Sequence, residues 1–164
     1  MTVDVETDVA LAGTKVISAL RDNLEQSLGH KIPITWFVRM QRGWTDSVRN
    51  DTASFFESPV ESAYDGFRLL QPILSDLVER GDEVAWHYRA YHYVHREDLS
   101  HEQKIRNVEA DLVACAGYIR QNYPQLPIHS FRWGWLFVPD FRLYDVLYKL
   151  GFHIDASVDP LRTG

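Results

Sequence analysis

Two carboxylates share one face of the first predicted strand. The chain opens with Thr-Val-Asp-Val-Glu-Thr-Asp at positions 2–8, in which apolar and acidic residues alternate. Side chains on a strand point alternately to its two faces, so Asp4 and Glu6 lie on one face and the valines on the other. Neighbouring carboxylates repel each other unless a cation or a basic group lies between them. The pattern therefore predicts chemistry at this strand.

Three histidines, His87, His92 and His95, lie within nine residues at the end of a later predicted strand. Imidazole nitrogen and carboxylate oxygen together form a usual ligand set for zinc, and also for iron, cobalt or manganese. Joined to Asp4 or Glu6, these histidines could hold a divalent metal. From spacing alone, a surface loop with scattered histidines is an equally good interpretation.

An arginine and two tryptophans come from a further predicted strand. Arg132 on an inward polar face needs an anion, and Asp4 or Glu6 would serve. An ordinary salt bridge at a strand end is the simpler interpretation. Trp133 and Trp135 could wall a sugar-binding groove, because aromatic faces suit flat or cyclic ligands. Both could equally be core residues, and the alternation along the strand favours the core for Trp133.

Strands alternate with helices along the chain and must position these residues. In the first predicted helix, 13–29, Ile17, Leu20, Leu24 and Leu28 have the spacing of an amphipathic helix. Residues 41–59 are predicted to be a long loop or an irregular helix. Five strands are expected at 2–8, 33–39, 83–87, 128–133 and 152–158, and further helices at 67–81, from Ser100 and after Pro139.

Residue details refine the later helices. Pro72 predicts either a kink or a late start for the second helix. Ser100 and Gln103 have the spacing of a capping box at the start of the third. Cys115 lies on the apolar stripe of that helix, so a buried structural thiol is expected rather than a nucleophile. Pro139 is expected in the first turn of the last helix.

Alternation of strands and helices, five strands deep, predicts an α/β fold with a parallel sheet and right-handed crossovers. Functional residues are then expected just beyond the carboxyl ends of the strands. Polar residues share one face of each of two successive strands: Ser130 with Arg132, and His153 with Asp155 and Ser157. This favours a barrel with a polar mouth over an open sheet covered on both faces.

Composition narrows the class of protein. The 164 residues suit one domain, 1–164, and the net charge of −6 argues against a nucleic-acid partner. The single cysteine excludes an internal disulfide. There is no apolar run of membrane-spanning length and no apolar leader before the first strand, so a cytoplasmic protein is expected.

The order of the motifs resembles the polysaccharide deacetylase superfamily (NodB homology, carbohydrate esterase family 4), in the branch with Asp-Val-Glu at the first motif. The resemblance covers essentially the whole chain. After the opening segment it is carried by Ile-Thr-Trp-Phe-Val (34–38), Gly-Asp-Glu-Val-Ala-Trp-His (81–87), Phe-Arg-Trp-Gly-Trp (131–135) and Leu-Gly-Phe-His-Ile-Asp-Ala-Ser-Val (150–158). It implies a distorted (β/α) barrel and a carbohydrate substrate. It also implies a divalent metal, zinc above all, that activates water to remove N-acetyl or related acyl groups.

The resemblance also implies roles for the residues of the first and third motifs. Asp4 resembles the catalytic base, and Glu6 or Asp8 would be the metal carboxylate. His87 matches the first metal histidine. Tyr91 occupies the position of the second histidine, so His92, one residue later, is the expected substitute.

The remaining implied roles concern the base and the substrate. Arg132 resembles the arginine that orients the base. Trp133 and Trp135 resemble the walls of the substrate groove, and Tyr91 is a further expected substrate contact.

Five strands are fewer than the seven or eight or so of such a barrel. The family's general acid, a late histidine, would lie beyond the fifth strand. The chain is therefore expected to be part of a longer protein or to be completed by another chain, with self-association possible through open barrel edges. Two other functions stay open: a non-catalytic carbohydrate-binding relative, and, less favoured, a metal-dependent sugar isomerase or aldolase-like barrel.

Overall fold

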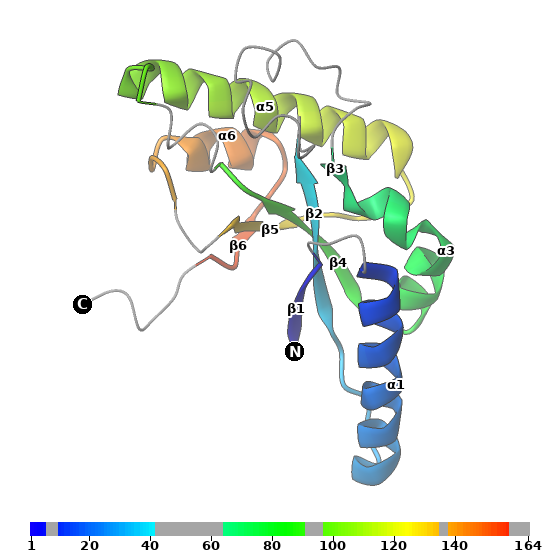
Figure 1. Cartoon of the computed structure of the whole chain (residues 1–164). Coiled ribbons are helices and arrows are strands. Elements are labelled where there is room, and N and C mark those ends of the chain that lie inside the picture. The colour runs from blue at the N-terminus through cyan, green and yellow to red at the C-terminus, as the bar shows by residue number, and fades with distance from the viewer. Residues whose placement is uncertain (6–9, 42–63, 91–96, 135–137, 158–164) are drawn as a thin grey trace, which may run out of the picture.

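The computed structural model describes residues 1–5, 10–41, 64–90, 97–134 and 138–157 of the chain. Figure 1 shows a twisted sheet accompanied by helices. The strands are β1 (Thr2–Val5), β2 (Thr35–Gln41), β3 (Tyr64–Asp65), β4 (Glu83–Tyr88), β5 (Ser130–Trp133) and β6 (Ile154–Asp155). The helices are α1 (Ala10–Leu28), α3 (Gly66–Glu79), α5 (His101–Asn122) and α6 (Leu143–Lys149).

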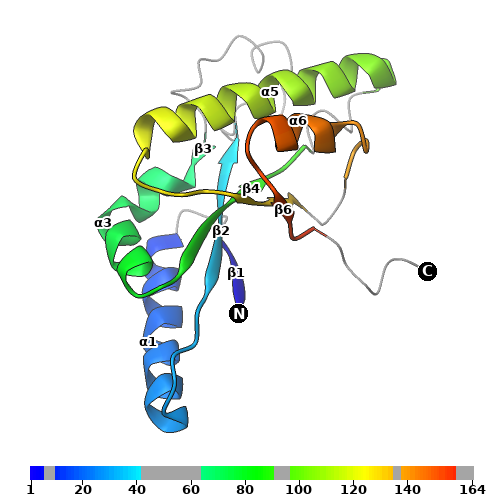
Figure 2. The same ribbon diagram turned by 180° about the vertical axis from the view of Figure 1, so that it is seen from behind.

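Five of the strands form a parallel sheet in the order β1-β2-β4-β5-β6, and the two-residue β3 pairs antiparallel with β2. The predicted α/β class with a parallel sheet is confirmed. Each strand of the parallel sheet lies beside the parallel strand that precedes it in the chain, and crossovers of a single hand then place the connecting helices on one face. Figures 1 and 2 show the helices along one side of the sheet.

The core lies between the sheet and these helices. Alternate residues of the central strands point into it, among them Trp36, Val38, Val84, Trp86, Tyr88, Phe131 and Trp133, and they pack with residues of α3 and α5 such as Leu70, Leu74, Val108 and Leu112. The intervening residues point to the other side of the sheet, which we call the inner face. It is defined by Asp4, Phe37, Arg39, His87 and Arg132, and the predicted site lies on it.

A buried ion pair docks α1 on the rest of the protein. Nη1 of Arg21 donates to both carboxylate oxygens of Asp82, at the start of β4, and both side chains are 1% exposed or less. The same carboxylate accepts hydrogen bonds from the backbone N–H of Ile34 at 3.1 Å and from the indole N–H of Trp36 at 2.9 Å. Asp82 therefore joins α1, the start of β2 and the start of β4, and its charge is compensated by four hydrogen bonds.

This pair turns α1 so that a polar face is buried. Arg21 and Thr14 are 2% exposed, whereas Val16, Leu20, Leu24 and Leu28 are between 51% and 60% exposed. The apolar stripe of an amphipathic helix ordinarily faces the core. Here only Ile17 of the predicted stripe packs against the core, and the three leucines face solvent.

Most predicted elements are present, with shifted bounds. The capping box at Ser100 and Gln103 is confirmed, and so is the burial of Cys115 at 0% exposure. Pro72 lies inside α3, so the late start is wrong. Pro139 precedes α6 by four residues rather than lying in its first turn, and the last strand is limited to Ile154–Asp155. The predicted loop from 42 to 59 lies outside the described residues.

None of the helices that the structure describes is long and apolar enough to cross a lipid bilayer.

Replacing the acid of the buried pair should destabilise the whole domain. In Asp82→Asn the Arg21 guanidinium stays buried without its counter-charge, so we expect the free energy of unfolding to fall by about 3–5 kcal/mol. The matched control is Asp22→Asn, a neighbour of Arg21 on α1, which breaks an exposed contact with Arg80 just after α3 and should change stability by about 1 kcal/mol at most. Urea unfolding measures both, and equal losses would contradict the role of the pair.

Candidate functional site

Asp4 and Arg132 meet on the inner face although 128 residues separate them in the chain. Nη1 of Arg132 donates to Oδ1 of Asp4 at 2.7 Å. Asp4 lies on β1 and Arg132 on β5, which are three strand spacings apart in the sheet. In a flat sheet three spacings of about 4.8 Å would separate the strands by about 14 Å, more than these two side chains span. The sheet is therefore curled about its inner face.

Two further contacts fix the guanidinium of Arg132. Its Nε donates to the carbonyl oxygen of Ala156 at 3.2 Å. Its Cζ lies 3.9 Å from the centre of the Phe37 ring on β2, a distance at which the ring face attracts a cation. These two contacts hold the guanidinium of Arg132 independently of Asp4. The side chain of Asp4 is 39% exposed. The carboxylate is the accessible partner.

His87 lies next to Arg132 in the sheet. Strand register pairs Arg39 with His87 and His87 with Arg132, so three basic side chains form a row across β2, β4 and β5 on the inner face. His87 is 1% exposed and Arg39 is 3% exposed. The row brings an imidazole and two guanidiniums to one level of the sheet, beside the carboxylate that Arg132 binds.

The amino-terminal end of the inner face is occupied by a different cluster. Glu83 accepts hydrogen bonds from the hydroxyls of Thr35, at 3.0 Å, and Ser130. These contacts link β2, β4 and β5 below the level of His87. The polar groups of this cluster bind one another, so the polar side chains that remain available to a ligand lie at the carboxyl end of the strands. Sequence reasoning missed Glu83, although it lies four positions before His87 on the same face of β4, and it missed Phe37, whose strand β2 carries none of the predicted site residues.

The polar residues of the last strand lie on the opposite side of the sheet. Register pairs Asp155 with Phe131, a core residue, and not with Arg132. Oδ1 of Asp155 accepts hydrogen bonds from the backbone N–H of Ser157 at 2.9 Å and from its hydroxyl, whose oxygen accepts from the N–H of Trp133 at 2.7 Å. The prediction that Asp155 and Ser157 continue the polar face of Arg132 is therefore wrong.

Trp133 is buried in the core at 0% exposure and packs edge-on against Tyr88 at 5.8 Å. Of the two interpretations open for it, the core position is the one observed, so it presents no face to a sugar. Several residues of the predicted site lie outside the described residues: Glu6, Asp8, Tyr91, His92, His95 and Trp135. Within the described ranges, no group of three or more histidine, cysteine or acidic side chains is placed to hold a metal ion.

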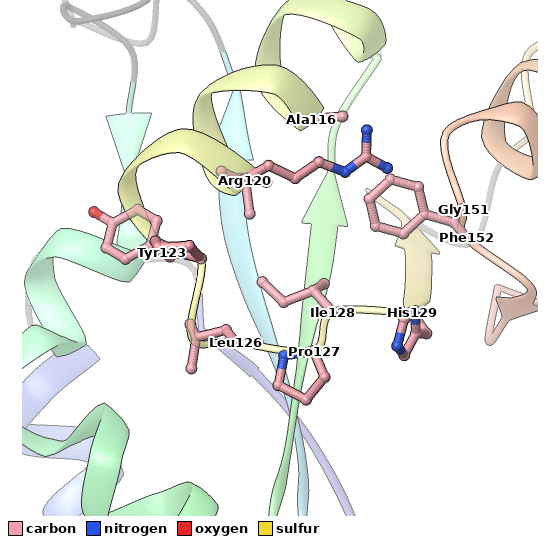
Figure 3. Close-up of a pocket in the computed structure, with 11 residues that line it drawn as sticks. Ala116, Arg120, Tyr123, Leu126, Pro127, Ile128, His129, Gly151 and Phe152 are labelled. Atoms are coloured by element: carbon pink, nitrogen blue, oxygen red, sulfur yellow. The ribbon is translucent and has the colours of Figure 1, made fainter.

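A hollow of about 280 Å³ lies at the amino-terminal end of β5, away from the Arg132 contact. Figure 3 shows Ile128 and Leu126 on its strand side and Tyr123 with Arg120 on the side of α5. Nη2 of Arg120 donates to the carbonyl oxygen of Leu150. The hollow contains none of the predicted site residues, and its cation is used to hold the turn after α6.

Comparison of the chain with protein-family models finds no match, and comparisons with curated proteins and with solved structures find none either. The family resemblance therefore depends on the motifs in the sequence.

Tyr144 of α6 tests the placement of Asp155 on the helix side. Burial, and then the hydrogen bond and charge of Asp155, raise the pKa of Tyr144 from 10 to about 12. The stability that this phenol contributes is present below pH 10 and is lost as the pH rises through about 12. Titration of tyrosinate absorbance should show that Tyr144→Phe removes an ionisation near pH 12. Asp155→Asn should shift that ionisation to lower pH, and an unchanged titration would contradict the contact.

Proposed function

We propose that this domain is a metal-dependent hydrolase of the polysaccharide deacetylase type, which removes N-acetyl or related acyl groups from an amino sugar or glycan. The observation that carries the proposal is the contact between Asp4 and Arg132 at 2.7 Å. It joins the carboxylate that the motifs assign as base to the arginine that they assign to orient it. Residues far apart in the sequence are thereby brought together in the pair that the resemblance implies.

The arrangement of the sheet supports a distorted (β/α) barrel. Consecutive parallel strands with helices on one face form the wall of a barrel, whereas a doubly wound sheet reverses its strand order. The reach of Arg132 to Asp4 requires the curl that a barrel wall has. Polar residues on the inner face also lie at the carboxyl ends of the strands, where barrels carry their active sites.

A divalent metal fits the donor chemistry of the inner face in part. His87 supplies an imidazole nitrogen, a donor that suits zinc, in the row that contains Arg132. Within the described residues no group forms a complete metal site. On the resemblance, we propose His87, Glu6 and His92 as the residues that would hold the ion. When bound, the metal would lower the pKa of water and polarise the acyl carbonyl.

Two residues of the chain then have separate roles, one in proton transfer and one in positioning. Asp4 accepts the proton of the attacking water as general base. Arg132 orients the Asp4 carboxylate through the Nη1 contact. The Phe37 ring and the Ala156 carbonyl hold the guanidinium in place. The burial of His87 favours charge stabilisation in this region, because electrostatic interactions are stronger where water is excluded.

Metal content and turnover provide the direct test. The wild-type chain should bind about one equivalent of zinc. Together with the general acid expected beyond the fifth strand, it should release acetate from N-acetylated chito-oligosaccharides, and a chelator should abolish the release. His87→Ala should lose both the metal and the activity. His129→Ala, a substitution at the hollow beyond the amino end of β5, is the matched control and should keep both. A wild-type chain without metal, or equal metal in His87→Ala, would contradict the proposal.

The base is tested separately from the metal. Asp4→Asn keeps the size of the side chain but cannot accept the proton, so we expect kcat to fall roughly 10²- to 10⁴-fold with the metal content unchanged. Asp22→Asn controls for the loss of one negative charge. A carbohydrate-binding domain without catalysis would instead bind the glycan equally well in both variants, with or without chelator, and release no acetate.

A further inference from the structure

The exposed side of α1 has the composition of an interface. Val16, Leu20, Leu24 and Leu28 form an i, i+4 row, each between 51% and 60% exposed. The exposed residues beside this row are Ala19, Asn23 and Ser27, which are small or uncharged. By helical geometry, the uncharged surface covers about half of the circumference of α1. Contiguous exposed apolar surface of this kind marks an interaction site.

The direction of this surface, which we call the leucine band, follows from the charged residues of α1. Arg21 points into the core towards Asp82, and Asp22 bonds to Arg80, directly after α3. The leucine band is therefore turned away from α3, towards the end of the sheet at β1. Among the described strands β1 pairs only with β2, so one edge of the sheet and the leucine band lie at the same end of the protein.

The opposite end of the sheet carries the complementary surface. A hollow of about 300 Å³ opens beside β6 and α6, and its lining includes Tyr144, Leu147, Tyr148, Phe152 and Ile154. Tyr148 is 69% exposed and Ile154 is 57% exposed. Within the described sheet, β6 pairs only with β5. An apolar ridge at one end of the molecule is thus matched at the other by a hollow in which aromatic and aliphatic side chains lie beside Asp145, His153 and Asp155.

We propose that a second copy of this chain covers both ends, with the leucine band of each copy seated in the hollow beside α6 and β6 of its partner. All five strands of the main sheet run in the same direction. Rotation of one copy about an axis along the strands therefore brings β1 of each copy beside β6 of the other, still parallel. Two identical contacts close the pair and cover two exposed edges.

A symmetric contact of α1 with α1 would leave the hollow and β6 uncovered. The leucine band carries no charge, so in a chain with net charge −6 it brings no like charge to Asp145 and Asp155 in the lining of the hollow. These two observations favour the head-to-tail arrangement. The inference goes beyond the proposed hydrolase, and the association of the chain is measured separately from metal content and acetate release.

Sedimentation equilibrium of the 164-residue chain tests the proposal, with twice the 19.1 kDa chain mass as the expected result. Leu20→Glu with Leu24→Glu should weaken the association roughly a hundredfold or more, because two apolar contacts are replaced by charges. Val113→Glu is the matched control: Val113 is 49% exposed, but on α5. Circular dichroism should show all variants folded, since each position is exposed.

Mixing variants distinguishes the head-to-tail contact from other arrangements. Ile154→Glu, at the hollow, should also dissociate the pair. A mixture of this variant with Leu20→Glu/Leu24→Glu retains one intact contact of two, so it should associate more tightly than either variant alone. Absence of this rescue, a monomeric wild type at every concentration, or dissociation by Val113→Glu would overturn the proposal. So would a monomer that instead binds a different polypeptide through the leucine band.

Discussion

The buried ion pair between Arg21 and Asp82 is the interaction on which the rest of the structure depends. Its carboxylate also binds the N–H of Ile34 and the indole of Trp36, so one side chain sets α1, the start of β2 and the start of β4 relative to one another. From that point the register of β2 on β4 runs from Thr35 with Glu83 up to Arg39 with His87. The contacts of Asp82 at the amino ends of β2 and β4 thus determine that Arg39 lies opposite His87 at the carboxyl ends.

The polar residues of the inner face differ between the two ends of the strands: at one end they bind one another, and at the other a carboxylate stays accessible. At the amino end, Glu83 is tied to two hydroxyls, which joins three strands. At the carboxyl end, the carboxylate of Asp4 is held by one arginine and stays partly open to solvent. A carboxylate that is oriented but still accessible can take a proton from water, whereas a fully enclosed one such as Asp82 can only stabilise the fold. This difference favours Asp4 over Asp82 as the acid of the proposed site.

The sequence indicated the strands, their parallel arrangement and the placement of Asp4, His87 and Arg132 on one face, because alternation and residue type are local properties. It could not indicate register. Asp155 and Ser157 have the right alternation for a polar face, but pairing of Asp155 with Phe131 sends them to the helix side. Likewise, leucine spacing shows that a helix has an apolar stripe without showing what covers it. The choice was made by Arg21, a polar residue whose partner lies 61 positions away.

Curl of the sheet and exposure of the leucine band are linked by geometry. A sheet curled enough to bring Arg132 to Asp4 cannot be flattened against a second layer on its inner face, so its apolar surfaces remain at the helices and at the two ends. Docking α1 through a charged pair leaves its leucines at one of those ends, and the short β6 leaves aromatic and aliphatic side chains at the other. Because parallel strands keep their direction under rotation about the strand axis, each end has the strand direction needed to pair with the other. The same curl that brings Arg132 to Asp4 therefore also shapes the two ends of the sheet through which we propose that two copies associate.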